Sequence, residues 1–344
     1  MNSRERVFAL LEGRPVDRLP LMPITMLFAA AQIGARYGTY ALDYRVLAEA
    51  QVRTAERFDF DHVSGITETR EAPDCGAPVQ YFEDQPYAID ERQARLADKA
   101  ALAGLQLPDP LGGGHMHDRV RALALLKRRV GGERIVEGWV EGPCGAAADL
   151  RGINTLMLDF YDDPGFVREL FDFVLELALQ FSRAQVEAGA DLMGVGDPAA
   201  SLVGPRIYQE FVWPYQARLV AGLHAMGARV RLHICGNTRP VLEAMGRLGC
   251  EIVDLDSVVS LAEARRKMGP KQVLLGNIDP VRTLRDGSPD SVRAAMAECH
   301  CQAGAAYILG AGCEVPPGTP PENLRAMAEY ARGAANQNTS RKAN

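Results

Sequence analysis

The sequence predicts an α/β fold of the (β/α)8 TIM-barrel class, and three observations point to it. Short apolar segments rich in β-branched residues alternate with longer helical patterns along the chain. Eight such segments follow one another, and no repeat of solenoid period interrupts them. The length of 344 residues suits one large barrel.

Most of the expected strands are preceded by an expected helix with a recognisable start or end. Asp163 followed by Pro164 is typical of a helix start, because an acidic cap accepts from free amides and proline has a helical φ. Gly189 is typical of the end of that helix. The expected strands are 18–26, 61–67, 134–141, 191–197, 229–236, 251–257, 271–279 and 306–314.

One stretch, 71–110, departs from this alternation. It is rich in Pro, Asp and Gln, and we expect it to cross the barrel mouth with a small hairpin at 79–89. No linker is visible, so we expect a single domain over residues 1–334. The polar tail at 335–344 is expected to be disordered.

Composition narrows the class of protein. Lys and Arg number 38 against 44 Asp and Glu, a net charge of −6 that argues against nonspecific nucleic-acid binding. No apolar run reaches the roughly 18 residues of a membrane span, and the first residues contain no signal core, so we expect a cytoplasmic protein. Seven cysteines at irregular spacing favour metal or thiol chemistry over a disulfide framework.

Polar side chains gather where the expected strands end, and in a barrel these ends converge on one mouth. The stability of a barrel does not require polar side chains at these positions, so we take Glu141, Asp197 and Asp279 as catalytic candidates. Asn277 and Asp256 are candidates for binding a cofactor. An alternative is open for each aspartate, because Asp also commonly caps helices.

The most specific signal is His233-Ile234-Cys235 with a later Cys313. Positions i and i+2 of a strand point to the same side, so imidazole and thiol would project together into the mouth. Two thiolates and one imidazole form a catalytic zinc set, with a fourth place that Glu141 could fill. The alternative is that these cysteines are small core residues. Cys299-His300-Cys301 is a competing cluster, expected at the opposite end of the barrel.

Several segments resemble the uroporphyrinogen decarboxylase superfamily. The resemblance spans residues 4–330 and implies the (β/α)8 barrel argued above. Its segments are Phe160–Pro164, Gln185–Asp191, Phe211–Tyr215, Gly138–Pro143 and Gly276–Pro280.

The superfamily has a decarboxylase branch, in which an arginine-bearing segment after the first strand holds the substrate's carboxylates. Residues 22–29 contain no arginine here, so a metal-free decarboxylase is the alternative rather than the main hypothesis.

The other branch contains zinc- and corrinoid-dependent methyltransferases, including methylcobamide:coenzyme M methyltransferases. Its motif, His-x-Cys with a late Cys, is matched by His233, Cys235 and Cys313, and Glu141 resembles the glutamate that completes the zinc shell in some members. The resemblance implies Zn²⁺ and a methylcobamide carried by a partner corrinoid protein. A thiol or a methylated small molecule would be the other substrate, and both directions of transfer remain open. A noncatalytic zinc- or corrinoid-binding barrel is a third hypothesis.

Overall fold

The centre of the molecule is a curled sheet of seven parallel strands, seen in a computed structural model that describes residues 1–68 and 71–340, with side chains through residue 334. The strand order is β1-β4-β5-β6-β7-β8-β9, so neighbours in the sheet also follow one another along the chain. The strands are β1 (His62–Ser64), β4 (Ile135–Glu141), β5 (Leu192–Gly196), β6 (Arg229–Ile234), β7 (Ile252–Leu255), β8 (Val273–Ile278) and β9 (Tyr307–Ala311).

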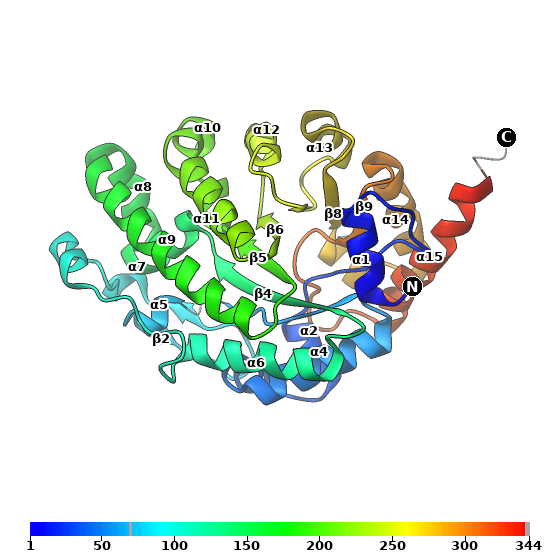
Figure 1. Cartoon of the computed structure of the whole chain (residues 1–344), viewed down its shortest axis with the longest axis horizontal. Coiled ribbons are helices and arrows are strands. Elements are labelled where there is room, and N and C mark those ends of the chain that lie inside the picture. The colour runs from blue at the N-terminus through cyan, green and yellow to red at the C-terminus, as the bar shows by residue number, and fades with distance from the viewer. Residues whose placement is uncertain (69–70, 341–344) are drawn as a thin grey trace.

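Helices connect the strands and surround them (Figure 1), as parallel pairing requires. None of the helices in the described ranges is long and apolar enough to cross a membrane. The helices are α1 (Ser3–Leu11), α2 (Leu27–Gln32), α3 (Tyr37–Leu42), α4 (Tyr44–Phe58), α5 (Glu71–Asp74), α6 (His115–Val130), α7 (Pro143–Arg151), α8 (Ile153–Asp162), α9 (Pro164–Glu187), α10 (Gly204–Ile207), α11 (Trp213–Ala225), α12 (Leu242–Gly246), α13 (Leu261–Met268), α14 (Pro289–Ala303) and α15 (Pro321–Ser340).

The first of the eight expected strands is not a member of the sheet. In that segment only Leu21 forms a bridge, with Leu309 of β9, whose N–H donates to the carbonyl of Pro20 at 2.9 Å. On the other side, the N–H of Asp61 donates to the carbonyl of Leu21 at 2.9 Å. Pro20 and Pro23 have no N–H to donate, which prevents a continuous ladder. The segment therefore lies between the two outer strands without extending the sheet.

The stretch at 71–110 contains α5 and a small antiparallel hairpin, β2 (Val79–Gln80) with β3 (Ala88–Ile89). At the other end of the chain, α15 continues through Ser340, past residue 334, where we expected the disordered tail to begin. This part of α15 contains no Pro or Gly that would end a helix. Residues 341–344 lie outside the described residues.

The space enclosed by the sheet is apolar at one end. Side chains of α1, including Val7 and Leu10, pack there against inward residues of five strands. Toward the other end Ile24, Ile66 and Trp139 form a second cluster. A Cβ at Gly194 would collide with the Trp139 ring, so glycine makes room for the indole. The buried charged residues Glu137, Arg231 and Asp254 lie further along their strands than the first of these clusters.

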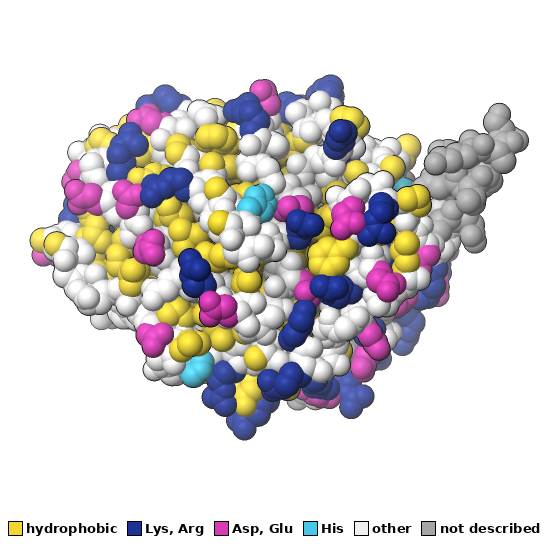
Figure 2. Space-filling model, in the orientation of Figure 1, with side chains coloured by type: hydrophobic (Ala, Val, Ile, Leu, Met, Phe, Trp, Pro, Cys, Tyr) yellow, Lys and Arg dark blue, Asp and Glu magenta, His cyan; other side chains and the backbone are white. Residues whose placement is uncertain are grey.

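The face of the molecule in Figure 2 carries acidic and basic side chains interspersed with hydrophobic ones. This mixture agrees with the near balance of 38 basic and 44 acidic residues.

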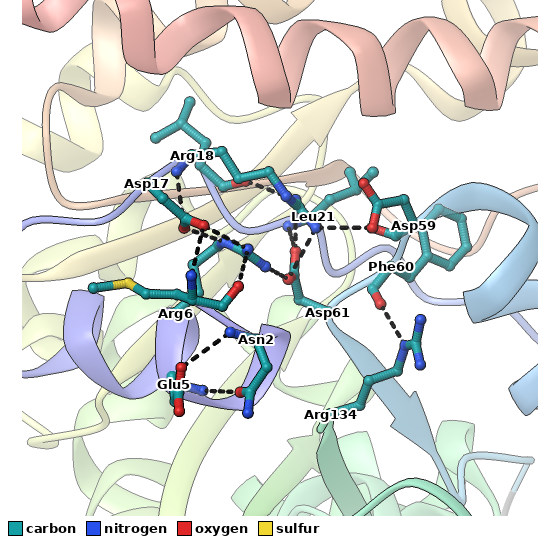
Figure 3. A network of polar contacts seen from close by, with 12 residues as sticks. Asn2, Glu5, Arg6, Asp17, Arg18, Leu21, Asp59, Phe60, Asp61 and Arg134 are labelled. Carbon is teal, nitrogen blue, oxygen red and sulfur yellow. Dashed lines mark hydrogen bonds and ion pairs between the residues drawn. The ribbon is translucent and has the colours of Figure 1, made fainter. Parts of the chain in front are cut away.

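A buried ion network holds the segment around Leu21 against the sheet (Figure 3). The Asp61 side chain is fully buried and accepts from Arg18 Nη1 at 2.9 Å and from the Leu21 N–H at 2.7 Å. Arg6 of α1 donates to the same carboxylate and also pairs with Asp17 at 2.6 Å. A single carboxylate therefore joins α1, the Leu21 segment and the start of β1.

We expect Asp61→Asn to lower the free energy of unfolding by about 3–5 kcal/mol, because it leaves two buried guanidinium groups short of a charged partner. Urea unfolding followed by circular dichroism measures this change.

Asp17→Asn is the matched control. Its side chain also pairs with Arg6 but is 42% exposed, so we expect a loss of about 1 kcal/mol or less. Equal losses for the two variants would contradict the assignment of Asp61 as the central carboxylate.

Candidate metal centre

Three potential metal ligands meet where β6 and β9 end. His233 lies within β6, Cys235 follows it, and Cys313 lies shortly after β9. His233 Nε2 is 3.2 Å from Cys235 Sγ, and the two sulfur atoms are 4.0 Å apart. All three donor atoms lie within 4.8 Å of one another. The structure thus brings together residues 78 positions apart in the chain.

The spacing of these atoms can be compared with that of a tetrahedral zinc site. Zinc bonds of about 2.3 Å to sulfur and about 2.0 Å to nitrogen place two sulfurs roughly 3.8 Å apart and nitrogen roughly 3.5 Å from sulfur. The 4.0 Å and 3.2 Å distances differ from these by a few tenths of an ångström. The third pair, His233 and Cys313, lies within 4.8 Å, and side-chain rotations would bring all three atoms to the spacing of zinc ligands.

The loop after β7 holds the two cysteine-bearing loops together. Asp256 Oδ2 accepts from the N–H of Gly236 at 2.7 Å, directly after Cys235. Gly236 has a φ of +81°, a conformation that favours glycine. On the other side, a Cβ at Gly312 would collide with the backbone of Ser257, so only glycine permits this close approach beside Cys313.

A buried carboxylate faces the other nitrogen of the imidazole. His233 and Asp254 are opposite each other in the β6–β7 register, and Nδ1 is 3.2 Å from Asp254 Oδ2. Arg231 donates to the same oxygen from Nη2 at 2.7 Å and approaches Glu137 at 3.1 Å from Nη1. Arg231, Asp254 and Glu137 are almost completely inaccessible to solvent.

These neighbours shift the protonation equilibria of the trio. Burial by itself lowers the pKa of His233, but the Asp254 carboxylate and Cys313 together outweigh it and raise that pKa to about 10. The hydrogen bond with Cys235 lowers the pKa of the Cys313 thiol; burial opposes this, and the nearby His233 reinforces it. The pKa of Cys235 is raised by the same contact and by burial. In the metal-free protein, Cys313 therefore loses its proton before Cys235.

Glu141 ends β4 close to the trio but is not one of the mutually close donors. Its N–H donates to Glu71 Oε1 at 2.9 Å, and its Oε2 lies near Gly145 of α7. The strand register places Glu141 opposite Gly196 and Gly196 opposite His233. No side chain of β5 therefore separates Glu141 from His233 at this level of the sheet.

The three strand-end aspartates all bind backbone N–H groups. Asp197 is fully buried and accepts from the Gly145 N–H at 2.7 Å, while burial raises its pKa to about 6. Asp256 holds the loop after Cys235. Asp279 caps the turn Pro280–Arg285, accepting from two N–H groups at 2.8 Å each.

Asn277 lies in β8 and also bonds to a loop. Its Nδ2 donates to the carbonyls of Asp256 at 2.9 Å and Val259 at 2.6 Å. Like the aspartates, it therefore holds the loop backbone near the strand ends.

The competing cysteine cluster does not converge. Cys301 is exposed, Cys299 lies 3.7 Å from Asn277 Oδ1, and His300 is 3.1 Å from the Tyr330 hydroxyl. Within the described ranges, the His233 trio is the group of His, Cys, Asp or Glu residues arranged to hold a metal. All seven cysteines are free, in agreement with the prediction that the chain has no disulfide framework.

Sequence reasoning missed the charged chain of Glu137, Arg231 and Asp254. Each lies within a strand. Glu137 is four residues before Glu141, Arg231 is two before His233, and Asp254 is two before Asp256. The period of two places such residues on the same inward side, so charged residues at these positions were an available signal.

Comparisons with known proteins agree with this architecture. A methylcobamide:CoM methyltransferase (MtbA) from Methanosarcina mazei is 29% identical over 96% of this chain and 97% of its own. A uroporphyrinogen decarboxylase from Thioalkalivibrio sulfidiphilus is 28% identical over 95% and 97%. The solved structure of a methyltransferase from Methanosarcina mazei superposes with a TM-score of 0.89 at 22% identity, covering 97% of this chain and 99% of that one.

The family comparison covers almost the whole chain. The family model named uroporphyrinogen decarboxylase (URO-D) matches residues 2–334, which include every strand and the complete His233 trio. With the curled parallel sheet and its TIM-barrel-like neighbour, this match shows that the chain belongs to the uroporphyrinogen decarboxylase (URO-D) family.

Proposed function

We propose that this protein is a methyltransferase that moves a methyl group between a corrinoid and a thiol or a methylated small molecule. Convergence of His233, Cys235 and Cys313 is the observation that carries the proposal. Two sulfur donors and one imidazole favour Zn²⁺ over Mg²⁺ or Ca²⁺. The similarity to methylcobamide:CoM methyltransferases supports the corrinoid as co-substrate.

A zinc ion at this site would lower the pKa of a substrate thiol, so that a thiolate exists at neutral pH. Cys235 and Cys313 would contribute two negative charges that balance a divalent ion. In the thiol-methylating direction, a lone pair on the substrate sulfur forms the new S–C bond. The Co–C bond breaks and its electron pair stays on cobalt. The methylated corrinoid is a large, flat co-substrate, which we propose a separate corrinoid protein presents.

We propose Glu141 as the residue that occupies the fourth metal position when no substrate is bound. Its place across Gly196 from His233 supports this role, because no β5 side chain lies between them. Asp197, Asp256, Asp279 and Asn277 enter the proposal as residues that position the strand-end loops. Their hydrogen bonds to backbone groups support that role.

We also propose that the Leu21 segment takes the place of the eighth strand and closes the sheet into a (β/α)8 barrel. Its hydrogen bonds to both outer strands or their flanks support closure. Residues 1–334 would then form one domain, with 71–110 shaping the mouth. A reducing compartment such as the cytoplasm would keep the two thiols available for metal.

Zinc analysis tests the metal site directly. Protein purified with zinc present should contain near-stoichiometric metal, and Cys235→Ala or Cys313→Ala should lose most of it, because two remaining ligands bind zinc weakly. Cys301→Ala is the control, since this exposed cysteine on α14 is outside the trio. A wild-type protein that takes up no zinc would overturn the proposal.

Methyl transfer can be followed by the visible absorbance of methylcobalamin with a panel of thiols that includes coenzyme M and homocysteine. We expect thiol-dependent demethylation by the zinc-loaded protein and a rate near background for Cys235→Ala. The competing hypothesis predicts a different product. Formation of coproporphyrinogen from uroporphyrinogen by zinc-free protein, without methylcobalamin turnover, would identify a decarboxylase instead.

A further inference from the structure

We propose that Asp254 is a positioning residue for the metal centre: held by Arg231, it fixes His233 with Nε2 directed at Cys235 and Cys313. The inference rests on the proposed metal site and deepens it. It assigns a role to charged residues that touch neither substrate nor metal.

The geometry gives one carboxylate oxygen two partners. Asp254 Oδ2 accepts from Arg231 at 2.7 Å and 3.1 Å, and the same oxygen lies 3.2 Å from His233 Nδ1. The guanidinium therefore fixes the oxygen in place. The contact with His233 is at ion-pair distance: Nδ1 has no hydrogen-bond partner among the described residues, and a small rotation of the ring would align its N–H with this oxygen. Once the imidazole is neutral, as metal binding requires, a carboxylate at Nδ1 favours the tautomer with a proton on Nδ1, which leaves the Nε2 lone pair for the metal.

The strand register makes this arrangement rigid. Arg231 and His233 are two residues apart in β6, so both side chains point inward, and Asp254 is opposite His233 in β7. Arg231 reaches across to Glu137 of β4, on the far side of β5. The chain of charges therefore spans four neighbouring strands, and the backbone hydrogen bonds of the sheet fix its width.

The combined charge of Glu137, Arg231 and Asp254 favours a cation at the His233 site. With His233 neutral, as a metal ligand must be, the ionised carboxylates of Glu137 and Asp254 and the guanidinium of Arg231 leave one net negative charge. Asp254 Oδ1 is buried without a hydrogen-bond partner among the described residues. An incompletely compensated negative charge in a medium of low dielectric constant attracts a nearby divalent ion. It also offsets part of the cost of burying the ion's charge.

Fold stability alone does not account for these residues. A buried ion pair can often be replaced by apolar side chains of similar volume at little or no cost. At the α1 end of the same interior most side chains are apolar, and the ion network of Asp61 there links α1 to the Leu21 segment and does not face a candidate metal ligand. Glu137, Arg231 and Asp254 lie instead at the level of His233 or below it, and Asp254 faces the site.

The test is the affinity of the full-length protein for Co²⁺, a spectroscopic substitute for zinc, measured by competition with a chromophoric chelator. We expect Asp254→Asn to bind Co²⁺ about 10–100-fold more weakly than wild type. We also expect its visible cobalt spectrum to shift, because the imidazole ligand is reoriented. In a His233→Gln background, the Asp254→Asn change should have little further effect, since Asp254 acts through His233.

Asp159→Asn is the matched control, because it also breaks a buried ion pair, with Arg151 at 2.7 Å, but lies away from His233. It should lower stability and leave Co²⁺ affinity and spectrum unchanged. If Asp254→Asn does not fold, Asp254→Glu replaces it: the charge that pairs with Arg231 is retained, the longer side chain displaces the oxygen, and weaker binding with an altered spectrum is again expected.

Wild-type affinity and spectrum in the Asp254 variant that folds would overturn the inference. Failure of the proposed function is distinguishable from this result, because there the wild-type protein itself would bind neither zinc nor Co²⁺. An equal loss of affinity in Asp159→Asn would also overturn the inference, since it would show a general effect of destabilisation.

Discussion

The buried guanidinium of Arg231 is the constraint on which the site depends. An arginine without access to water must be paired, and the sheet supplies Glu137 from one side and Asp254 from the other. The ion pairs with Arg231 fix the positions of both carboxylates close to the strand ends. One of them faces His233, so the demand for charge pairing inside the fold orients a buried side chain near the strand ends.

The cysteines depend on a different constraint, the close approach of loops. Cys235 and Cys313 follow strands that are not neighbours, since β7 and β8 lie between β6 and β9. The loop after β7 bridges the gap by hydrogen-bonding to Gly236 and packing on Gly312, where a side chain would not fit. A curled sheet provides the approximate convergence, and two glycines permit the final approach.

Local patterns in the sequence predict most strands and helices, because alternation of apolar segments with capped helices reflects local physics. The segment around Leu21 is the exception: its apolar pattern resembles a strand, but Pro20 and Pro23 remove the donors that a ladder needs. Strand-end positions likewise identify His233, Cys235 and Cys313 as neighbours. The role of Asp254 was missed because it depends on which residue of β6 lies opposite. That cross-strand register cannot be predicted from the sequence of either strand alone.

Family membership does not by itself choose between decarboxylation and methyl transfer, because relatives with both names match over nearly the whole chain. The local chemistry beside Cys313 does favour one of them. Glu314 accepts from the N–H groups of Met26 and Leu27, in the segment where the resemblance places the substrate-holding arginines of decarboxylases. Burial raises the pKa of Glu314 to about 8, so at neutral pH this side chain is mostly a neutral acid and supplies no positive charge where the arginines of decarboxylases would stand. Two thiols and an imidazole beside such a group are suited to a metal ion and a thiol.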